Sequence, residues 1–137
     1  MGIDYGTKRT GIAVTDPLKI IASGLETVST EEVFDFLAGY LSREEVEKMI
    51  VGFPLHPDGN PAQIAPLVEV FIKKLGELFP AVPVITWDER YTSEDAKRII
   101  LQSGARKKQR RDKALVDKIS AALILEDYLK ANEWNIQ

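Results

Sequence analysis

The chain has 137 residues, of which 45% are hydrophobic and 28% are charged, with a formal net charge of −3 at pH 7. This balance excludes a disordered or fibrous protein and fits one domain, residues 1–137, with a buried core. Because there is no cysteine, disulfides and thiolate metal sites are excluded, and a cytoplasmic protein is expected. No apolar run reaches the length of a membrane span, so we expect no membrane partner.

The first part of the chain is predicted to form strands, at residues 2–6, 10–15 and 19–28. In the second strand the bulky residues Ile12 and Val14 share one face. The other face carries the small residues Gly11 and Ala13. Thr30 then favours the start of a helix, because acidic residues and helically spaced apolar residues follow it.

The rest of the chain alternates between strands and helices. We expect a strand over 48–52, a loop over 53–61, a helix over 63–78, a strand over 82–87, a helix from Thr92 or Ser93 to Leu101, and a helix from Asp112 to about Ala131. One side of the helix over 63–78 is apolar, with Ile64, Leu67, Val68, Phe71, Ile72 and Leu75. This order predicts an α/β fold with a mixed sheet.

Asp4 lies inside the first predicted strand, between Ile3 and Tyr5. A carboxylate there costs several kcal/mol to desolvate unless it is paired or binds a cation. Gly2 and Gly6 on the same face leave room for such a partner. The alternative is an edge strand on which Asp4 faces solvent.

Asp117 lies on an otherwise apolar stripe of the last predicted helix. The residues that share this face are Ala114, Asp117, Ala121, Ile124 and Tyr128. Because aspartate is almost never buried without a partner, the stripe predicts a metal or a cationic side chain beside Asp117. The alternative is an aspartate favoured by the helix dipole near the first turn.

Glu89 belongs to a charged triplet, residues 88–90, that directly follows a predicted strand. Strand alternation gives Glu89 the same facing as Ile85 and Trp87, and in open α/β sheets ligands gather at the strand ends. The alternative is a solvated loop.

These three carboxylates, Asp4, Glu89 and Asp117, offer hard oxygen ligands. Such ligands suit Mg²⁺ or Mn²⁺, which can neutralise a phosphodiester and activate water for in-line attack. His56 is the one histidine of the chain, so a zinc site rich in histidine is excluded.

A basic stretch precedes the helix that carries Asp117, with six cations in the eight positions from Arg106 to Lys113. It could follow a phosphate backbone into the carboxylate site. The residues we expect to contact nucleic acid are Lys8, Arg9, Arg90, Arg106, Lys107, Arg110 and Arg111. The alternative for the basic stretch is a solvated loop.

Four motifs in this order resemble the YqgF-type family of pre-16S ribosomal RNA nucleases, and they lie at Gly2–Asp16, Val51–Gly59, Asp88–Thr92 and Asp117–Ala122. The resemblance spans nearly the whole chain. The family is also grouped with Holliday junction resolvases, because it shares their ribonuclease H-like fold.

The resemblance implies a ribonuclease H-like fold with a five-stranded mixed sheet flanked by helices. It implies that Asp4, Glu89 and Asp117 form a catalytic cluster that holds Mg²⁺ or Mn²⁺. It also implies hydrolysis of precursor ribosomal RNA during ribosome biogenesis. We expect nucleic acid as the partner and a monomer or weak homodimer.

Three rival functions are compatible with parts of the sequence. An actin-like ATPase would share a phosphate loop at residues 4–11, but 137 residues cannot build the two domains that close over a nucleotide. A resolvase of branched DNA would share the chemistry and differ in substrate. A non-catalytic RNA-binding assembly factor would keep the fold, although the three carboxylates count against it.

Overall fold

The computed structural model describes residues 1–16, 22–54, 63–89 and 112–133. In chain order the elements are β1 Gly2–Asp4, β2 Arg9–Thr15, β3 Ala22–Ser29, the 3-10 helix η1 Thr30–Glu32, α1 Val33–Arg43, β4 Met49–Pro54, α2 Ala65–Leu78, β5 Val84–Glu89 and α5 Lys113–Asn132. The helix expected after Thr92, the loop around His56 and the basic stretch up to Arg111 lie outside the described residues. Within the described ranges, no helix is long and apolar enough to cross a membrane.

The strands of the described chain form one five-stranded sheet in the order β3-β2-β1-β4-β5. β1 is antiparallel to β2 and parallel to β4, and β5 is parallel to β4, so the sheet is mixed as predicted. Because β1 lies in the middle of the sheet, the alternative in which Asp4 sits on an edge strand is wrong.

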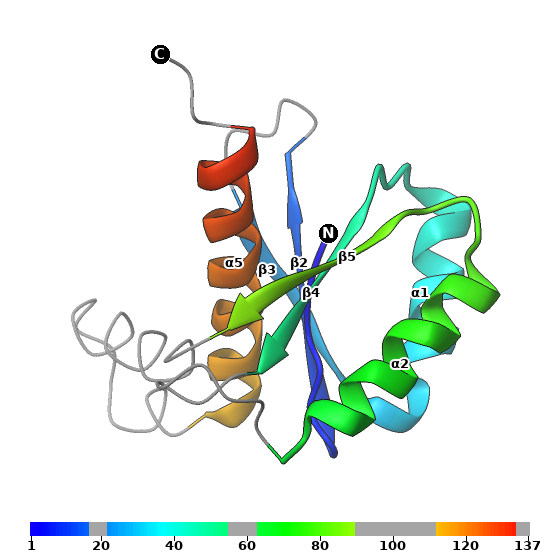
Figure 1. Cartoon of the computed structure of the whole chain (residues 1–137), viewed down its shortest axis with the longest axis horizontal. Helices are drawn as coiled ribbons and strands as arrows, with labels where there is room; N and C mark the ends of the chain where they lie inside the picture. The colour runs from blue at the N-terminus through cyan, green and yellow to red at the C-terminus, as the bar shows by residue number, and fades with distance from the viewer. Residues whose placement is uncertain (17–21, 55–62, 90–111, 134–137) are drawn as a thin grey trace.

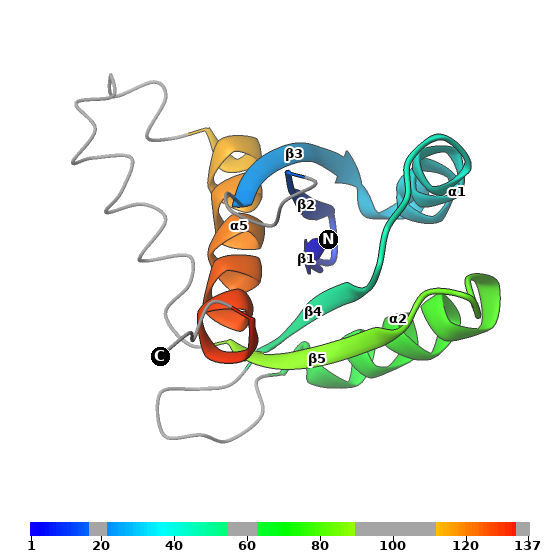
Figure 2. The same ribbon diagram turned by 90° about the horizontal axis from the view of Figure 1, so that it is seen from above.

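Helices cover both faces of the sheet. α5 packs on one face, and α1 and α2 pack on the other, as the two views show (Figures 1 and 2). Strand alternation divides the core accordingly, because Ile12 packs with the α1 and α2 side whereas Ala13 packs with the α5 side. The predicted separation of bulky and small residues along β2 is therefore confirmed, and so is the α/β sheet flanked by helices.

The predicted apolar side of α2 is confirmed in part. Val68, Phe71 and Leu75 are buried against the sheet. Leu67 is 48% exposed, so its placement on the buried side was wrong. The buried stripe follows positions 68, 71 and 75, and Leu67 lies about 100° around the helix from Val68.

The final helix follows the prediction closely. Asp112 caps α5, since its Oδ1 accepts hydrogen bonds from the backbone nitrogens of Ala114 and Leu115 at 3.0 and 3.4 Å. The side of α5 that faces the sheet includes the buried residues Ala121 and Ile124. The predicted stripe is thus the one that packs on the sheet.

The small face of β2 is what allows α5 to pack so closely. A Cβ atom on Gly11 would lie 2.1 Å from the carbonyl oxygen of Asp117. A Cβ on Gly2 would likewise lie 2.7 Å from the carbonyl oxygen of Ala121. Both contacts involve helix backbone, which cannot rotate away, so α5 can occupy this position only above residues that lack a side chain.

We predict that Gly11→Ala destabilises the protein by about 2 kcal/mol or more, because the added methyl group overlaps the α5 backbone. The matched control is Gly76→Ala in α2, where an added Cβ meets no described atom within 4 Å. Alanine in a helix is favoured over glycine, so this control should be about 0.5–1 kcal/mol more stable than wild type. Urea denaturation of both variants measures the difference, and equal stabilities would contradict the close approach.

Candidate active site

One edge of the sheet collects the ends of several elements. The parallel strands β1, β4 and β5 all end there, and their last residues are Asp4, Pro54 and Glu89. The early turns of α5 lie near the end of β1, because Gly11, the strand partner of Asp4, lies beneath Asp117, whereas β5 ends beside the later turns of α5 (Figure 2). Carboxyl ends of strands in an open sheet are a common place for a ligand site.

Asp4 and Asp117 meet at this edge through Gly11. Asp4 and Gly11 are direct partners across the antiparallel β1–β2 pair, so they share one face of the sheet. Gly11 lies directly beneath Asp117, whose Cβ would be 3.2 Å from a Cβ on that glycine. Two of the three predicted site residues are therefore neighbours, although they are far apart in sequence.

Glu89 reaches the same edge from a different strand. Its backbone pairs with Pro54 at the end of β4, and β5 is separated from β1 by β4. Two strand spacings amount to about 10 Å between the backbones of β1 and β5. Earlier in β5, Ile85 and Trp87 pack toward α5, and the Trp87 ring meets Tyr128 edge-on with 5.5 Å between centroids.

Asp117 has the cationic neighbour that its position predicts, and that neighbour is Arg9. The Arg9 Nε donates a hydrogen bond of 2.9 Å to Asp117 Oδ2. Arg9 was predicted as a contact for nucleic acid, and its pairing with Asp117 was missed. The spacing indicates only the face of β2 on which Arg9 lies, because Arg9 is two residues from Gly11.

The backbone that carries Arg9 is held by Thr30. The Thr30 hydroxyl donates to the Gly6 carbonyl at 2.6 Å, and the Thr30 backbone nitrogen donates to the Lys8 carbonyl at 3.0 Å. The Thr10 hydroxyl lies 2.9 Å from the Thr30 hydroxyl and is fully buried. Thr30 was predicted to start a helix. It does start η1, but its side chain secures the β1–β2 turn instead of capping a helix.

The described carboxylates alone do not complete a metal site. Within the described residues, no three His, Cys, Asp or Glu side chains cluster closely enough to hold a metal ion. Asp4 and Asp117 still offer hard oxygen donors on one face of the sheet, which is the donor chemistry that Mg²⁺ or Mn²⁺ requires.

The predicted contacts for nucleic acid are only partly described. Lys8 is exposed in the turn beside Arg9, close to the carboxylate edge. Arg90, Arg106, Lys107, Arg110 and Arg111 lie outside the described residues.

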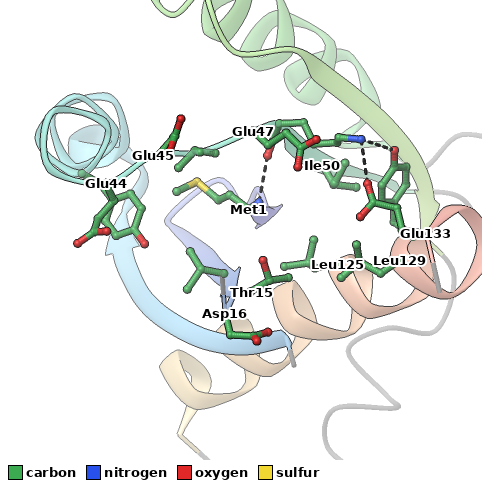
Figure 3. Close-up of a pocket in the computed structure, with 15 residues that line it drawn as sticks. Met1, Thr15, Asp16, Glu44, Glu45, Glu47, Ile50, Leu125, Leu129 and Glu133 are labelled. Atoms are coloured by element: carbon green, nitrogen blue, oxygen red, sulfur yellow. Dashed lines mark hydrogen bonds and ion pairs between the residues drawn. The ribbon is translucent and has the colours of Figure 1, made fainter. Parts of the chain in front are cut away.

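A cavity of about 580 Å³ lies at the opposite edge of the sheet, where β4 and the chain begin and α5 ends (Figure 3). Five carboxylate residues line it, namely Asp16, Glu44, Glu45, Glu47 and Glu133. Lys48 pairs with Glu133 at 3.1 Å, and the Met1 ammonium donates to the Lys48 carbonyl at 3.0 Å. Burial lowers the pKa of that ammonium to about 6. An acidic cavity repels phosphate, so it does not suit a nucleic-acid substrate.

Comparison with known proteins finds relatives that match nearly the whole chain. A family model described as "RuvX: Holliday junction resolvase" matches residues 1–131. A Porphyromonas gingivalis protein named "Putative pre-16S rRNA nuclease" is 50% identical over 129 residues, which are 94% of each chain. Proteins of the same name from Flavobacterium johnsoniae and Bacteroides thetaiotaomicron are each 46% identical over 134 residues, covering 98% of this chain and 97% of theirs.

We predict that Thr30→Val destabilises the protein by about 1–3 kcal/mol, because the buried Thr10 hydroxyl and the Gly6 carbonyl lose their partner. Thr7→Val makes the same chemical change at an exposed position of the same turn and should alter stability by less than about 0.5 kcal/mol. Thermal unfolding compares the two variants. Similar melting temperatures would mean that Thr30 does not anchor the turn.

Proposed function

The chain belongs to the RuvX Holliday junction resolvase family, and we propose that it is a divalent-metal-dependent nuclease that processes precursor 16S ribosomal RNA. The name shared by its relatives supports both the reaction class and the RNA substrate. We further propose that it works in the cytoplasm as one domain, residues 1–137, and as a monomer or weak homodimer.

The observation that supports the metal-dependent reaction is the position of Gly11, which pairs with Asp4 across β1 and β2 and lies beneath Asp117. A central strand and a helix bring two carboxylates together on one face, and this arrangement costs electrostatic energy unless cations compensate it. Only one guanidinium, that of Arg9, is seen beside Asp117 within the described residues. A divalent cation bound on this face would add positive charge beside the two aspartates.

We assign the metal ligands to Asp4, Glu89 and Asp117. Asp4 and Asp117 would hold a cation between β1 and α5, and Glu89 would complete the donor set from the end of β5. A bound divalent cation would neutralise the scissile phosphate and lower the pKa of an attacking water. The backbones of β1 and α5 would keep the two aspartates oriented without further rearrangement.

The basic residues would guide the substrate to this edge. Lys8 is exposed beside the carboxylates, and Arg90 directly follows Glu89 in the chain. The stretch from Arg106 to Arg111 leads into α5 and so into Asp117. Cations in this arrangement would offset the overall negative charge of the protein where a phosphate backbone approaches.

A second candidate function is the resolution of branched DNA, which the description of the matching family favours. The same carboxylates would serve, because metal-assisted hydrolysis of a phosphodiester is common to both substrates. A four-way DNA junction and a precursor 16S ribosomal RNA, offered side by side, distinguish the two functions.

We predict that Asp4→Asn lowers cleavage dependent on Mg²⁺ or Mn²⁺ at least roughly a hundredfold while RNA binding is retained. The amide keeps the size of the side chain but removes the charge that holds a hard cation. The melting temperature without metal should stay the same or rise, because one of several repelling carboxylates is gone. Asp35→Asn, on the exposed side of α1, is the matched control and should behave as wild type.

The cleavage rate is measured on labelled single-stranded RNA, precursor ribosomal RNA and four-way DNA junctions. The melting temperature is measured on the same protein samples. A structural role for Asp4 predicts the opposite pattern, in which stability and binding fall together. Wild-type protein that neither cleaves any of these substrates nor gains stability from Mn²⁺ would favour a non-catalytic RNA-binding assembly factor.

We predict that neutral replacements of Arg106, Lys107, Arg110 and Arg111 weaken RNA binding and reduce its salt dependence. Each lost phosphate contact should lower the slope of log affinity against log salt by about one unit. Filter binding measures the slope between roughly 50 and 200 mM salt, because phosphate contacts weaken strongly over this range. An unchanged slope with a normal melting temperature would identify the stretch as a solvated loop.

A further inference from the structure

The ion pair between Arg9 and Asp117 occupies the carboxylate that the proposed site needs for a cation. The Arg9 Nε lies 2.9 Å from Asp117 Oδ2, and the two side chains are 39% and 23% exposed. The pair is therefore reachable by water and ions, unlike a buried structural pair. Its energy is correspondingly modest, because solvent screens partly exposed charges.

The backbones on both sides of this pair are held in place. A Cβ on Gly6 would lie 2.4 Å from the Arg9 carbonyl oxygen, so the turn before Arg9 is closed tightly. Asp117 is equally constrained, because its helix rests on Gly11. A change of partner at Asp117 can consequently come only from the side chains, and the long arginine side chain has the rotamers to move away.

In the metal-free protein, the ion pair between Arg9 and Asp117 reduces the negative charge on this face of the sheet. Asp4 shares the face of Asp117, so the two carboxylates raise the local negative potential. Arg9 neutralises the charge of Asp117. A divalent cation bound to Asp117 Oδ2 would stand beside the guanidinium, and the two positive charges would repel each other.

We infer that Arg9 is the internal counterion of Asp117 and that it competes with a divalent cation for this carboxylate. Arg9 stabilises the metal-free protein, and cation binding displaces its guanidinium. The inference rests on the proposed function, because it takes Asp117 as a cation ligand. It assigns to Arg9 a role in positioning and regulating the site that is separate from contact with the substrate.

The test is Mn²⁺ binding by full-length wild type, Arg9→Gln and Arg9→Lys, measured by calorimetry. Arg9→Gln removes the competing charge, so its affinity for Mn²⁺ should rise roughly threefold to tenfold. Arg9→Lys keeps the charge and should stay close to wild type. Arg43→Gln, at the end of α1 on the opposite face of the sheet, removes the same charge elsewhere and should leave the affinity unchanged.

Melting temperatures provide a second readout that does not need catalysis. Arg9→Gln should melt below wild type in EDTA, and this deficit should shrink or reverse in saturating Mn²⁺ because the variant binds the ion more tightly. A deficit of the same size in both buffers would mean that Arg9 is only a structural partner of Asp117, and this would overturn the inference.

A measurement on the wild-type protein covers the case in which Arg9→Gln does not fold. The Arg9 Nε–H resonance should be protected from solvent exchange without metal and should lose that protection on titration with Mg²⁺. Unchanged protection, or weaker Mn²⁺ binding by Arg9→Gln, would overturn the inference while the metal site stands. Absence of Mn²⁺ and Mg²⁺ binding by every variant and by wild type would instead overturn the proposed function.

Discussion

The close contact between α5 and β2 is the constraint on which the rest of the site depends. It exists because Gly11 has no side chain, so the carbonyl of Asp117 can occupy the space that a Cβ would fill. The contact sets the height of α5 above the sheet. It thereby places a helix aspartate next to the Asp4 strand position, and two distant parts of the sequence meet in one site.

The two edges of the sheet carry different charged residues. At the edge where β1 ends, Arg9 balances Asp117 and exposed Lys8 adds a second cation. At the opposite edge a cavity is lined by several carboxylates, and Lys48 is held by Glu133. The carboxylates of the second edge would repel a phosphate backbone, which is consistent with our proposal that nucleic acid binds at the first.

Thr30 links the conformation of the β1–β2 turn to the position of Arg9. Thr30 holds the Gly6 and Lys8 carbonyls and so determines the path of the β1–β2 turn. Arg9 follows that turn directly, and its guanidinium reaches Asp117 across to α5. Residues with no direct part in hydrolysis thus control the electrostatic state of a proposed metal ligand, which is common where a site is built on rigid elements.

The sequence by itself determined the strands and helices of the described residues and most of their buried faces. Periodicity indicated the strands, α2 and α5, and the Asp112 cap was evident from the residue type. It also marked Asp4 and Asp117 as carboxylates in apolar surroundings. The prediction for Leu67 was wrong because this residue lies at the margin of the apolar side of α2, where a leucine side chain can face solvent. Only the tertiary structure decided that Asp117 pairs with Arg9. Pairing between residues 108 positions apart depends on sheet order and helix height, which no local pattern encodes.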